Sequence, residues 1–355
     1  MNSFSEDEFD KIPDAILLLI LNQISDIKTL THCKTVSKRF NSLVPQVETL
    51  LVKVDCVIST TSSESGDWFS LFNIIKSIFQ SFQDLLTSPR KLLSPNKFSN
   101  SPTDILRGFE KIKKLEIELP SGDLKLEKGI TLRWKAEFGK SLKSCVILAV
   151  RSIEYGDQKG GGGDDHDDEI DFHGDGSGGL KLRVVWTISS LIAASTRHYL
   201  LREVIKEHKE IESLVLSDRE NEGKVVMNQQ GLKEFRVHEE ENGGGGGGGG
   251  GGVDLSTSTV QGWKNNRTVV PAVRMRMRHE SKLDLSCGVR MRGATLVVVR
   301  PAITDEFERR KNWKSEIEER QEDKELALGA FDGVFGEAVE ALMKRRSYLL
   351  EMNSF

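Results

Sequence analysis

Residues 9–44 read FDKIPDAILLLILNQISDIKTLTHCKTVSKRFNSLV, and this stretch predicts three short helices. Asp14 follows Pro13 and is expected to cap the first helix, because its carboxylate can accept a hydrogen bond from a free backbone N–H of the first turn. Asp26 is expected to cap the second helix, which runs through Leu30, in the same way. The third helix follows from the helical spacing of its apolar residues, Val36, Phe40, Leu43 and Val44.

The first of these helices is too apolar to lie at a water surface. Between Ala15 and Ile24 it is apolar on most sides, through Ile16, Leu17, Leu18, Leu19, Ile20, Leu21 and Ile24. Such a helix has to be covered from more than one direction. Since a module of this length cannot build a sufficient core alone, the composition predicts a partner surface. The alternative is an ordinary helical hairpin at the N-terminus.

The order of residues in this stretch resembles an F-box, the helical module that binds a Skp-type adaptor of a cullin ubiquitin ligase. The resemblance implies one face against the adaptor and the other toward the rest of the chain. The signature positions, and hence the expected adaptor-binding residues, are Ile12, Pro13, Leu17, Ile20, Leu30, Val36, Lys38 and Phe40. The sequence departs from the pattern at Phe40, where tryptophan is usual, and at Ser37, where cysteine is usual. The link between the first two helices is also one residue longer than usual.

Composition excludes several other classes of function. The chain has 355 residues and a formal net charge of −4, which predicts neither a nucleic-acid nor an acidic-membrane partner. Its four cysteines show no CxxC or paired spacing, so we expect no disulfide framework, no metal site and no cofactor. The acidic start MNSFSEDEFD lacks a secretory signal, and no transmembrane segment is expected. The nucleus, the cytoplasm or both are the expected location.

A six-residue apolar pattern recurs four times along the chain. The copies are Ile112-x-x-Leu115-x-Ile117, Leu142-x-x-Cys145-x-Ile147, Ile211-x-x-Leu214-x-Leu216 and Leu232-x-x-Phe235-x-Val237. Each predicts a short strand with alternate residues on one side, as in leucine-rich repeats. Because residues 186–211 also have helical spacing, the C-terminal region is predicted to be an α/β domain. We expect an irregular leucine-rich-repeat-like parallel sheet backed by helices, and the alternative is a generic α/β sheet.

Low-complexity segments suggest the domain limits. We expect an all-α F-box module at 1–50, a linker with an amphipathic helix at 51–104, and an α/β substrate-recognition domain at 105–355. Flexible insertions are expected at 156–179 and 239–262, which hold a Gly/Asp segment and ten consecutive glycines. Helical spacing at 68–86 predicts a helix that packs in the core or against the F-box or, as the alternative, one that binds a membrane surface or a partner. The segment LKLRVVW at 180–186 is expected to be a strand.

Three arginines alternate with apolar residues after the glycine tract. If VPAVRMRMRH forms a strand, then Arg274, Arg276 and Arg278 lie on one face of it. One interpretation is a solvated strand face. The other is a basic patch that binds an acidic or phosphorylated substrate segment, because the guanidinium fork matches phosphate oxygens.

Three blocks extend the resemblance to nearly the whole chain outside the glycine insertions. They are LKLRVVWTISSLIAASTRHYLL at 180–201, MRGATLVVVRP at 291–301 and KRRSYLLEMNSF at 344–355. These are similar to a plant F-box family that includes auxin-upregulated members. The resemblance implies a non-catalytic substrate receptor of a Skp–cullin–F-box ligase, bound to the adaptor and through it to cullin. The alternative is a scaffold or decoy that binds the adaptor without delivering a substrate. An enzyme is disfavoured because no nucleophile elbow, HExxH, phosphate loop or paired-carboxylate motif is present.

Overall fold

The computed structural model describes residues 11–53, 106, 108–120, 129–155, 177–243, 263–264, 267–302 and 316–355. Its contacts divide the chain into two compact units. The first comprises Met1–Ser121, Leu200–Arg219 and Met227–Glu240, and the second comprises Gly122–Tyr199, Glu220–Val226 and Glu241–Phe355. The helix predicted at 68–86 and most of both expected insertions lie outside the described residues. None of the helices in the described ranges is long and apolar enough to cross a membrane.

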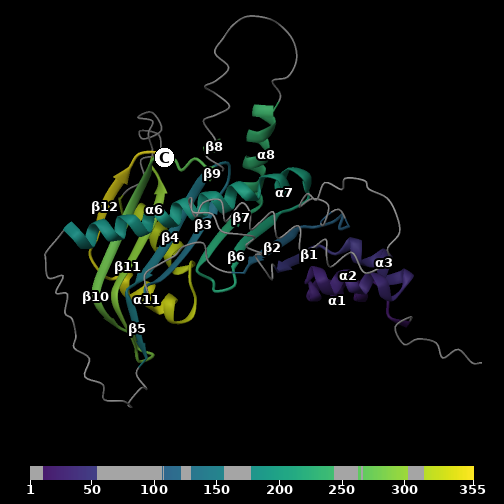
Figure 1. The fold of residues 1–355 in the computed structure, drawn as a ribbon, viewed down its shortest axis with the longest axis horizontal. Helices are drawn as coiled ribbons and strands as arrows, with labels where there is room; N and C mark the ends of the chain where they lie inside the picture. Colours follow the sequence, from purple (N-terminus) through teal and green to yellow (C-terminus); the bar gives the residue numbers. More distant parts are fainter. Residues whose placement is uncertain are drawn as a thin grey trace, which may run out of the picture. The chain divides into compact units, whose positions relative to one another are not determined.

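The first unit begins with the three predicted helices (Figure 1): α1 (Asp14–Ile24), α2 (Ile27–Val36) and α3 (Lys38–Leu43), followed by the short 3-10 helix η2 (Val44–Gln46). Asp26 caps α2 as predicted, since its side chain accepts a hydrogen bond from the backbone N–H of Thr29 at 2.9 Å. The predicted cap at Asp14 is wrong. Pro13 holds the cap position without a side-chain bond, and Asp14 instead forms an ion pair with Arg39 at 2.6 Å.

Three parallel strands complete this unit together with two further helices. The strands are β1 (Thr49–Lys53), β2 (Lys114–Leu119) and β6 (Ser213–Asp218), in the order β1-β2-β6. Leu50 is paired with Leu115, and Leu115 is paired with Leu214, so one buried leucine from each strand lies in a single row. The helices are α7 (Arg202–Glu207) and α8 (Gln229–Gly243).

The four predicted repeats do not form one parallel stack. The copies at Ile112 and Ile211 lie at neighbouring strands, β2 and β6. The copy at Leu142 forms an antiparallel strand, and the copy at Leu232 lies in helix α8. In α8 the first two apolar residues, Leu232 and Phe235, are buried and Val237 is exposed, because positions i and i+3 also share one side of a helix. The predicted strand is therefore confirmed for the copy at Leu142 and wrong for the copy at Leu232, and neither copy belongs to a parallel stack with the other two.

The second unit contains a mixed sheet with strand order β7-β3-β4-β11-β10-β12, and β5 pairs with β11. Most neighbours are antiparallel, whereas β3 and β7 are parallel. The strands are β3 (Thr131–Phe138), β4 (Leu142–Val150), β5 (Ser152–Tyr155), β7 (Gly223–Met227), β10 (Val273–Asp284), β11 (Val289–Pro301) and β12 (Ser347–Met352). Two short strands, β8 (Trp263–Lys264) and β9 (Arg267–Thr268), pair separately. The coarse prediction of N-terminal helices followed by an α/β region is thus confirmed.

Helices cover both faces of the mixed sheet strands in the second unit. Helix α6 (Ser177–Leu200) crosses the strands in Figure 1 and places the His198 ring against Phe138, with 4.3 Å between ring centroids. The strand predicted at 180–186 is wrong, because this segment belongs to α6. Helices α10 (Glu316–Leu328) and α11 (Gly333–Met343) pack on the side chains of Val146 and Val298, in a common core with Leu296, Ala327, Ala338, Val339 and Leu342.

Candidate functional site

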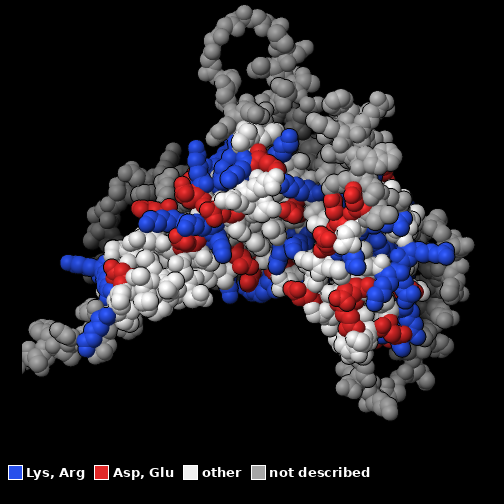
Figure 2. Space-filling view, turned by 180° about the vertical axis from the view of Figure 1, so that it is seen from behind, with Lys and Arg blue, Asp and Glu red and all other residues white. Residues whose placement is uncertain are grey.

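Helix α1 carries apolar side chains that its own unit does not cover. Ile16, Leu19 and Ile20 are 46%, 61% and 46% exposed, and Val36 at the end of α2 is 72% exposed. Ile16, Leu19 and Ile20 share one side of the helix, because residues three and four positions apart are neighbours on its surface. Figure 2 shows a broad area without charged side chains over these N-terminal helices. We call Ile16, Leu19, Ile20 and Val36 the apolar face.

The other side of α1 belongs to the core of the helical module. Leu17 and Leu21 are buried, as are Ile27 and Leu30 of α2. Helix α1 thus presents one apolar side inward and a second one outward. This arrangement explains why the helix is apolar on most sides although only part of it is covered.

Polar contacts fix the module within its unit. Arg39 donates from Nε to the Asp14 carboxylate at 2.8 Å and from Nη2 to the carbonyl of Ile12, which ties α3 to the start of α1. The Asn22 side-chain oxygen accepts from the backbone N–H of Glu48 at 2.8 Å, where the chain enters β1. These bonds hold the apolar face on a rigid support.

Lys34 connects α2 to a part of the same unit that is distant in the sequence. Its Nζ donates to the carbonyl of Gly108 at 2.9 Å and lies 4.6 Å from the centroid of the Phe109 ring. Burial lowers the pKa of Lys34. Since the desolvated ammonium has a carbonyl and an aromatic face as partners, the contact is compatible with its charge.

The predicted adaptor-binding residues divide into two groups. Six lie at least partly at the surface: Ile12, Pro13, Ile20, Val36, Lys38 and Phe40. Leu17 and Leu30 are buried, so their position favours a role in shaping the module rather than direct contact. Sequence reasoning missed Ile16 and Leu19 as surface residues. Their signal was the spacing with Ile20, because positions i, i+3 and i+4 share one side of a helix.

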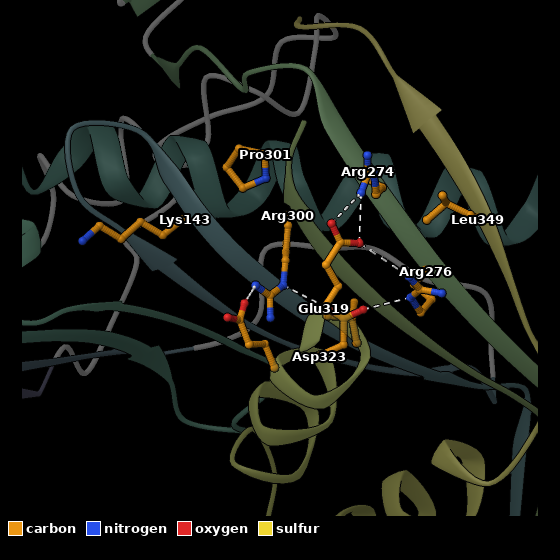
Figure 3. A pocket seen from close by; sticks show the side chains of 10 residues that line it. Lys143, Arg274, Arg276, Arg300, Pro301, Glu319, Asp323 and Leu349 are labelled. Atoms are coloured by element: carbon orange, nitrogen blue, oxygen red, sulfur yellow. Dashed lines mark hydrogen bonds and ion pairs between the residues drawn. The ribbon is translucent and has the colours of Figure 1, made fainter. Parts of the chain in front are cut away.

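The three predicted arginines lie on β10 and, as expected, point to one face of the sheet. The expected solvated face is wrong, because Arg276 and Arg278 are only 7% and 5% exposed. Helix α10, which sequence reasoning did not identify, covers them. Figure 3 shows Glu319 and Asp323 of this helix directed at the arginines.

The acidic side chains of α10 form ion pairs with two of the three arginines. Arg274 Nη1 lies 3.1 Å from Glu319 Oε2, and Arg276 Nε donates to Asp323 Oδ2 at 2.9 Å. Arg300 of β11 lies opposite Arg274 and adds contacts to Asp323 at 2.8 Å and Glu322 at 2.6 Å. Carboxylates of the same chain therefore occupy positions that an acidic substrate segment would need.

A cavity of about 230 Å³ lies beside these ion pairs. Besides the paired residues, its lining includes Lys143, Val298, Pro301 and Leu349 (Figure 3). Charges of both signs line the cavity, so it is not a simple anion pocket.

A metal site and nucleophilic chemistry each place their own requirements on the described residues. They contain no group of three or more His, Cys, Asp or Glu side chains that could hold a metal ion. Cys145 is fully buried, and burial raises the pKa of its thiol, which disfavours the thiolate needed for nucleophilic chemistry. Burial lowers the pKa of His198 to about 3, and its Nδ1 lies 2.6 Å from the Thr268 hydroxyl.

Comparison with known proteins identifies the family. The chain is 47% identical to the F-box protein AUF2 of Arabidopsis thaliana over 98% of its length, and the match covers all of that protein. The F-box protein AUF1 of the same plant is 43% identical over 98% of the chain and is also covered completely. A third relative, the F-box protein At1g30200, is 38% identical over 99% of the chain, and the match covers 94% of it.

The chain belongs to the plant F-box proteins. This confirms the family that the sequence resemblance predicted. No family model matches the chain, and no solved structure matches it. The similarity to these F-box proteins extends over nearly the full length of the chain.

Proposed function

We propose that this F-box protein is the substrate-recognition subunit of a Skp–cullin–F-box ubiquitin ligase. The N-terminal helices bind the Skp-type adaptor, and the adaptor joins the protein to cullin. The second unit selects the protein to be ubiquitinated, in the nucleus, the cytoplasm or both. No step of the transfer chemistry falls to this chain. Family membership supports the general role, and the apolar face is the observation that carries the adaptor-binding half of the proposal.

The exposure of the apolar face supports a partner at this position. Scattered apolar residues are normal on protein surfaces, but grouped ones mark interaction sites. Ile16, Leu19 and Ile20 form such a group on a helix whose opposite side is anchored in a core. A rigid apolar surface loses little conformational entropy on binding, so more of the contact energy remains as affinity.

The proposal gives the module's residues two different roles. Leu19, Ile20 and Val36 are the expected direct contacts, together with Pro13 and Phe40 at the ends of the motif. Leu17 and Leu30 hold α1 against α2 and act on the adaptor only through the shape of the module.

Adaptor binding is tested with the full chain and purified Skp-type adaptor. Leu19→Glu places a charge in the centre of the apolar face without disturbing the core, because this side chain is exposed. We expect a loss of about 2 kcal/mol or more, which corresponds to a roughly thirtyfold weaker affinity. The matched control is Val237→Glu on α8, where the apolar side chain is 54% exposed. If Leu19→Glu and the control bound the adaptor equally well, the assignment would be wrong.

Delivery of a substrate is a separate step and needs a separate measurement. In cells, proteins that depend on this receptor should accumulate when it is removed and should return to normal levels with wild type but not with Leu19→Glu. The alternative function, a scaffold or decoy, predicts adaptor binding without such accumulation. One observation favours this alternative, namely that α10 fills the arginine face with carboxylates of the chain itself.

A further inference from the structure

The arginine row of β10, formed by Arg274, Arg276 and Arg278, contains one member without a partner among the described residues. Arg274 and Arg276 form ion pairs with Glu319 and Asp323. Arg278 is the next residue on the same face of the strand and forms no ion pair with the residues that the structure describes.

Arg278 is nevertheless buried. Only 5% of the residue is exposed, and its Nε and Nη1 atoms are inaccessible and without a hydrogen-bond acceptor in the described part of the chain. Burial is the main factor that lowers its pKa, and the neighbouring charges of Arg276 and Arg320 add to this effect. Among the carboxylates, Asp323 acts in the opposite direction, but it already binds Arg276 and Arg300.

A buried guanidinium without an acceptor is unfavourable, because its charge and its N–H groups lose hydration without replacement. The fixed fork of donors on arginine matches the two oxygens of a carboxylate or phosphate. An oxyanion placed at Arg278 would satisfy its unpaired donors and reduce the repulsion from Arg276 and Arg320. Among the described residues, carboxylates are supplied to Arg274 and Arg276 but not to Arg278.

We propose that Arg278 binds a carboxylate or phosphate group carried by an extended segment of the recruited protein. This inference rests on the proposed function and names the chemistry of its substrate. It also narrows the predicted patch from three arginines to one, since Arg274 and Arg276 have ion-pair partners among the described residues and Arg278 has none there.

The edge of the sheet explains why an extended segment is the expected carrier. Strand β12 ends the strand order and, among the described residues, pairs only with β10. Its free backbone groups can pair with an added strand. Ser347 of β12 is the register partner of Arg278, so a single strand with a small side chain at this position separates Arg278 from the edge. Leu349 of the same strand is 45% exposed and offers an apolar contact nearby.

The test uses the full chain and three peptide libraries with random flanks and a fixed central residue, either phosphoserine, glutamate or serine. Wild type should retain the phosphoserine library, the glutamate library or both at least tenfold more than the serine library, and the preferred library identifies the oxyanion. Arg278→Met should abolish this preference. Arg292→Met is the control, because it removes the same charge from an exposed site of the same unit that pairs with Glu154 at 2.6 Å. Equal retention of the three libraries by wild type, or an unchanged preference in Arg278→Met, would overturn the inference.

Stability distinguishes a binding role from a structural one. Because Arg278 is a buried charge that pairs with none of the described carboxylates, Arg278→Met should melt at the same temperature as wild type or higher. A melting temperature lowered as far as that of Arg276→Met, which breaks the pair with Asp323, would instead assign Arg278 a structural role. The adaptor assay with Leu19→Glu is independent of both results. A chain that binds the adaptor but does not discriminate among the libraries contradicts this inference alone, whereas the reverse result contradicts the adaptor-binding half of the proposed function.

Discussion

The N-terminal helices expose apolar side chains, whereas the second unit buries charged ones. In α1, Leu19 and Ile20 lie at the surface although neither side chain has a polar group that favours contact with water. In β10, Arg276 lies beneath α10, where a carboxylate has to compensate its charge. Each arrangement is unfavourable for the isolated chain, the first by exposed apolar area and the second by desolvation.

The two arrangements differ in how they respond to a partner. The apolar face gains free energy from contact area, with little dependence on pH or salt. The arginine row responds to a specific charge, because an oxyanion changes the balance between paired and unpaired guanidiniums. If the module recruits the adaptor and the arginine row selects the substrate, as proposed, mutations should change the two functions independently.

The largest effect is expected when the carboxylate shared by two arginines is removed. Asp323→Leu leaves Arg276 and Arg300 without their common partner beneath α10. Because a buried pair is broken from one side, we expect a loss of about 3–5 kcal/mol in the free energy of unfolding, measured by urea titration. Glu325→Leu in the same helix is the control, since this residue is exposed. If both variants unfolded at the same urea concentration, the ion pairs would not stabilise the second unit.

The next effect separates the two sides of the helical module. Leu30→Ala should cost about 2–5 kcal/mol in the free energy of unfolding, because its side chain is fully buried. Leu19→Ala should change stability by less than about 0.5 kcal/mol but weaken adaptor binding, since the side chain is exposed. Chemical unfolding and adaptor affinity are measured on both. If Leu30→Ala had normal stability but did not bind the adaptor, the result would indicate that Leu30 contacts the adaptor directly.

Local sequence patterns predicted the helices and strands of this fold better than they predicted contacts between residues far apart in the sequence. The cap at Asp26 and the strand through Arg274 and Arg278 are confirmed, because each depends on neighbours within a few residues. The cap at Asp14 failed because α1 begins at Asp14 itself, with Pro13 at the cap position, and Arg39, a residue 25 positions away, binds the free carboxylate. Such long-range competition leaves no periodic trace in the sequence.

The repeat pattern was also an incomplete guide to which segments form strands. Val47, Leu50 and Val52 have the same spacing as the copy at Ile112, are buried, and lead into β1, yet this copy was not identified. Conversely, the copy at Leu232 is helical, because apolar residues at i and i+3 suit a helix as well as a strand.

The sequence also could not predict which element covers the arginine row of β10. Arg274 and Glu319 are 45 residues apart, and the alternation in β10 says which face they share, not what lies above it. The acidic residues of α10 have the composition of a solvated helix. Only the tertiary arrangement shows that three of them, Glu319, Glu322 and Asp323, face arginines.

A smaller effect concerns pH and should be confined to the unit that buries polar groups. Burial lowers the pKa of His198 to about 3 in the folded protein, from 6.5 for an accessible histidine. Between these values the unfolded chain binds the proton more readily, so this residue's contribution to stability is complete above pH 6.5 and is lost as the pH falls toward 3. His198→Phe keeps a ring against Phe138 but cannot titrate. Its free energy of unfolding should fall less than that of wild type between about pH 7 and pH 4. Parallel curves for the two proteins would contradict the lowered pKa.

The smallest effect distinguishes the two aspartates at the starts of helices α1 and α2. Asp26→Ala removes the hydrogen bond to the Thr29 N–H and should cost about 1 kcal/mol in the free energy of unfolding. Asp14→Ala removes a surface ion pair with Arg39 and should cost between about 0 and 1 kcal/mol, less in high salt. Repeating both urea titrations at low and high salt separates them, because a cap bond to a backbone N–H depends on salt less than an exposed ion pair does. If Asp14→Ala lowered the free energy of unfolding as much as Asp26→Ala does, at both salt concentrations, the result would indicate that Asp14 caps α1.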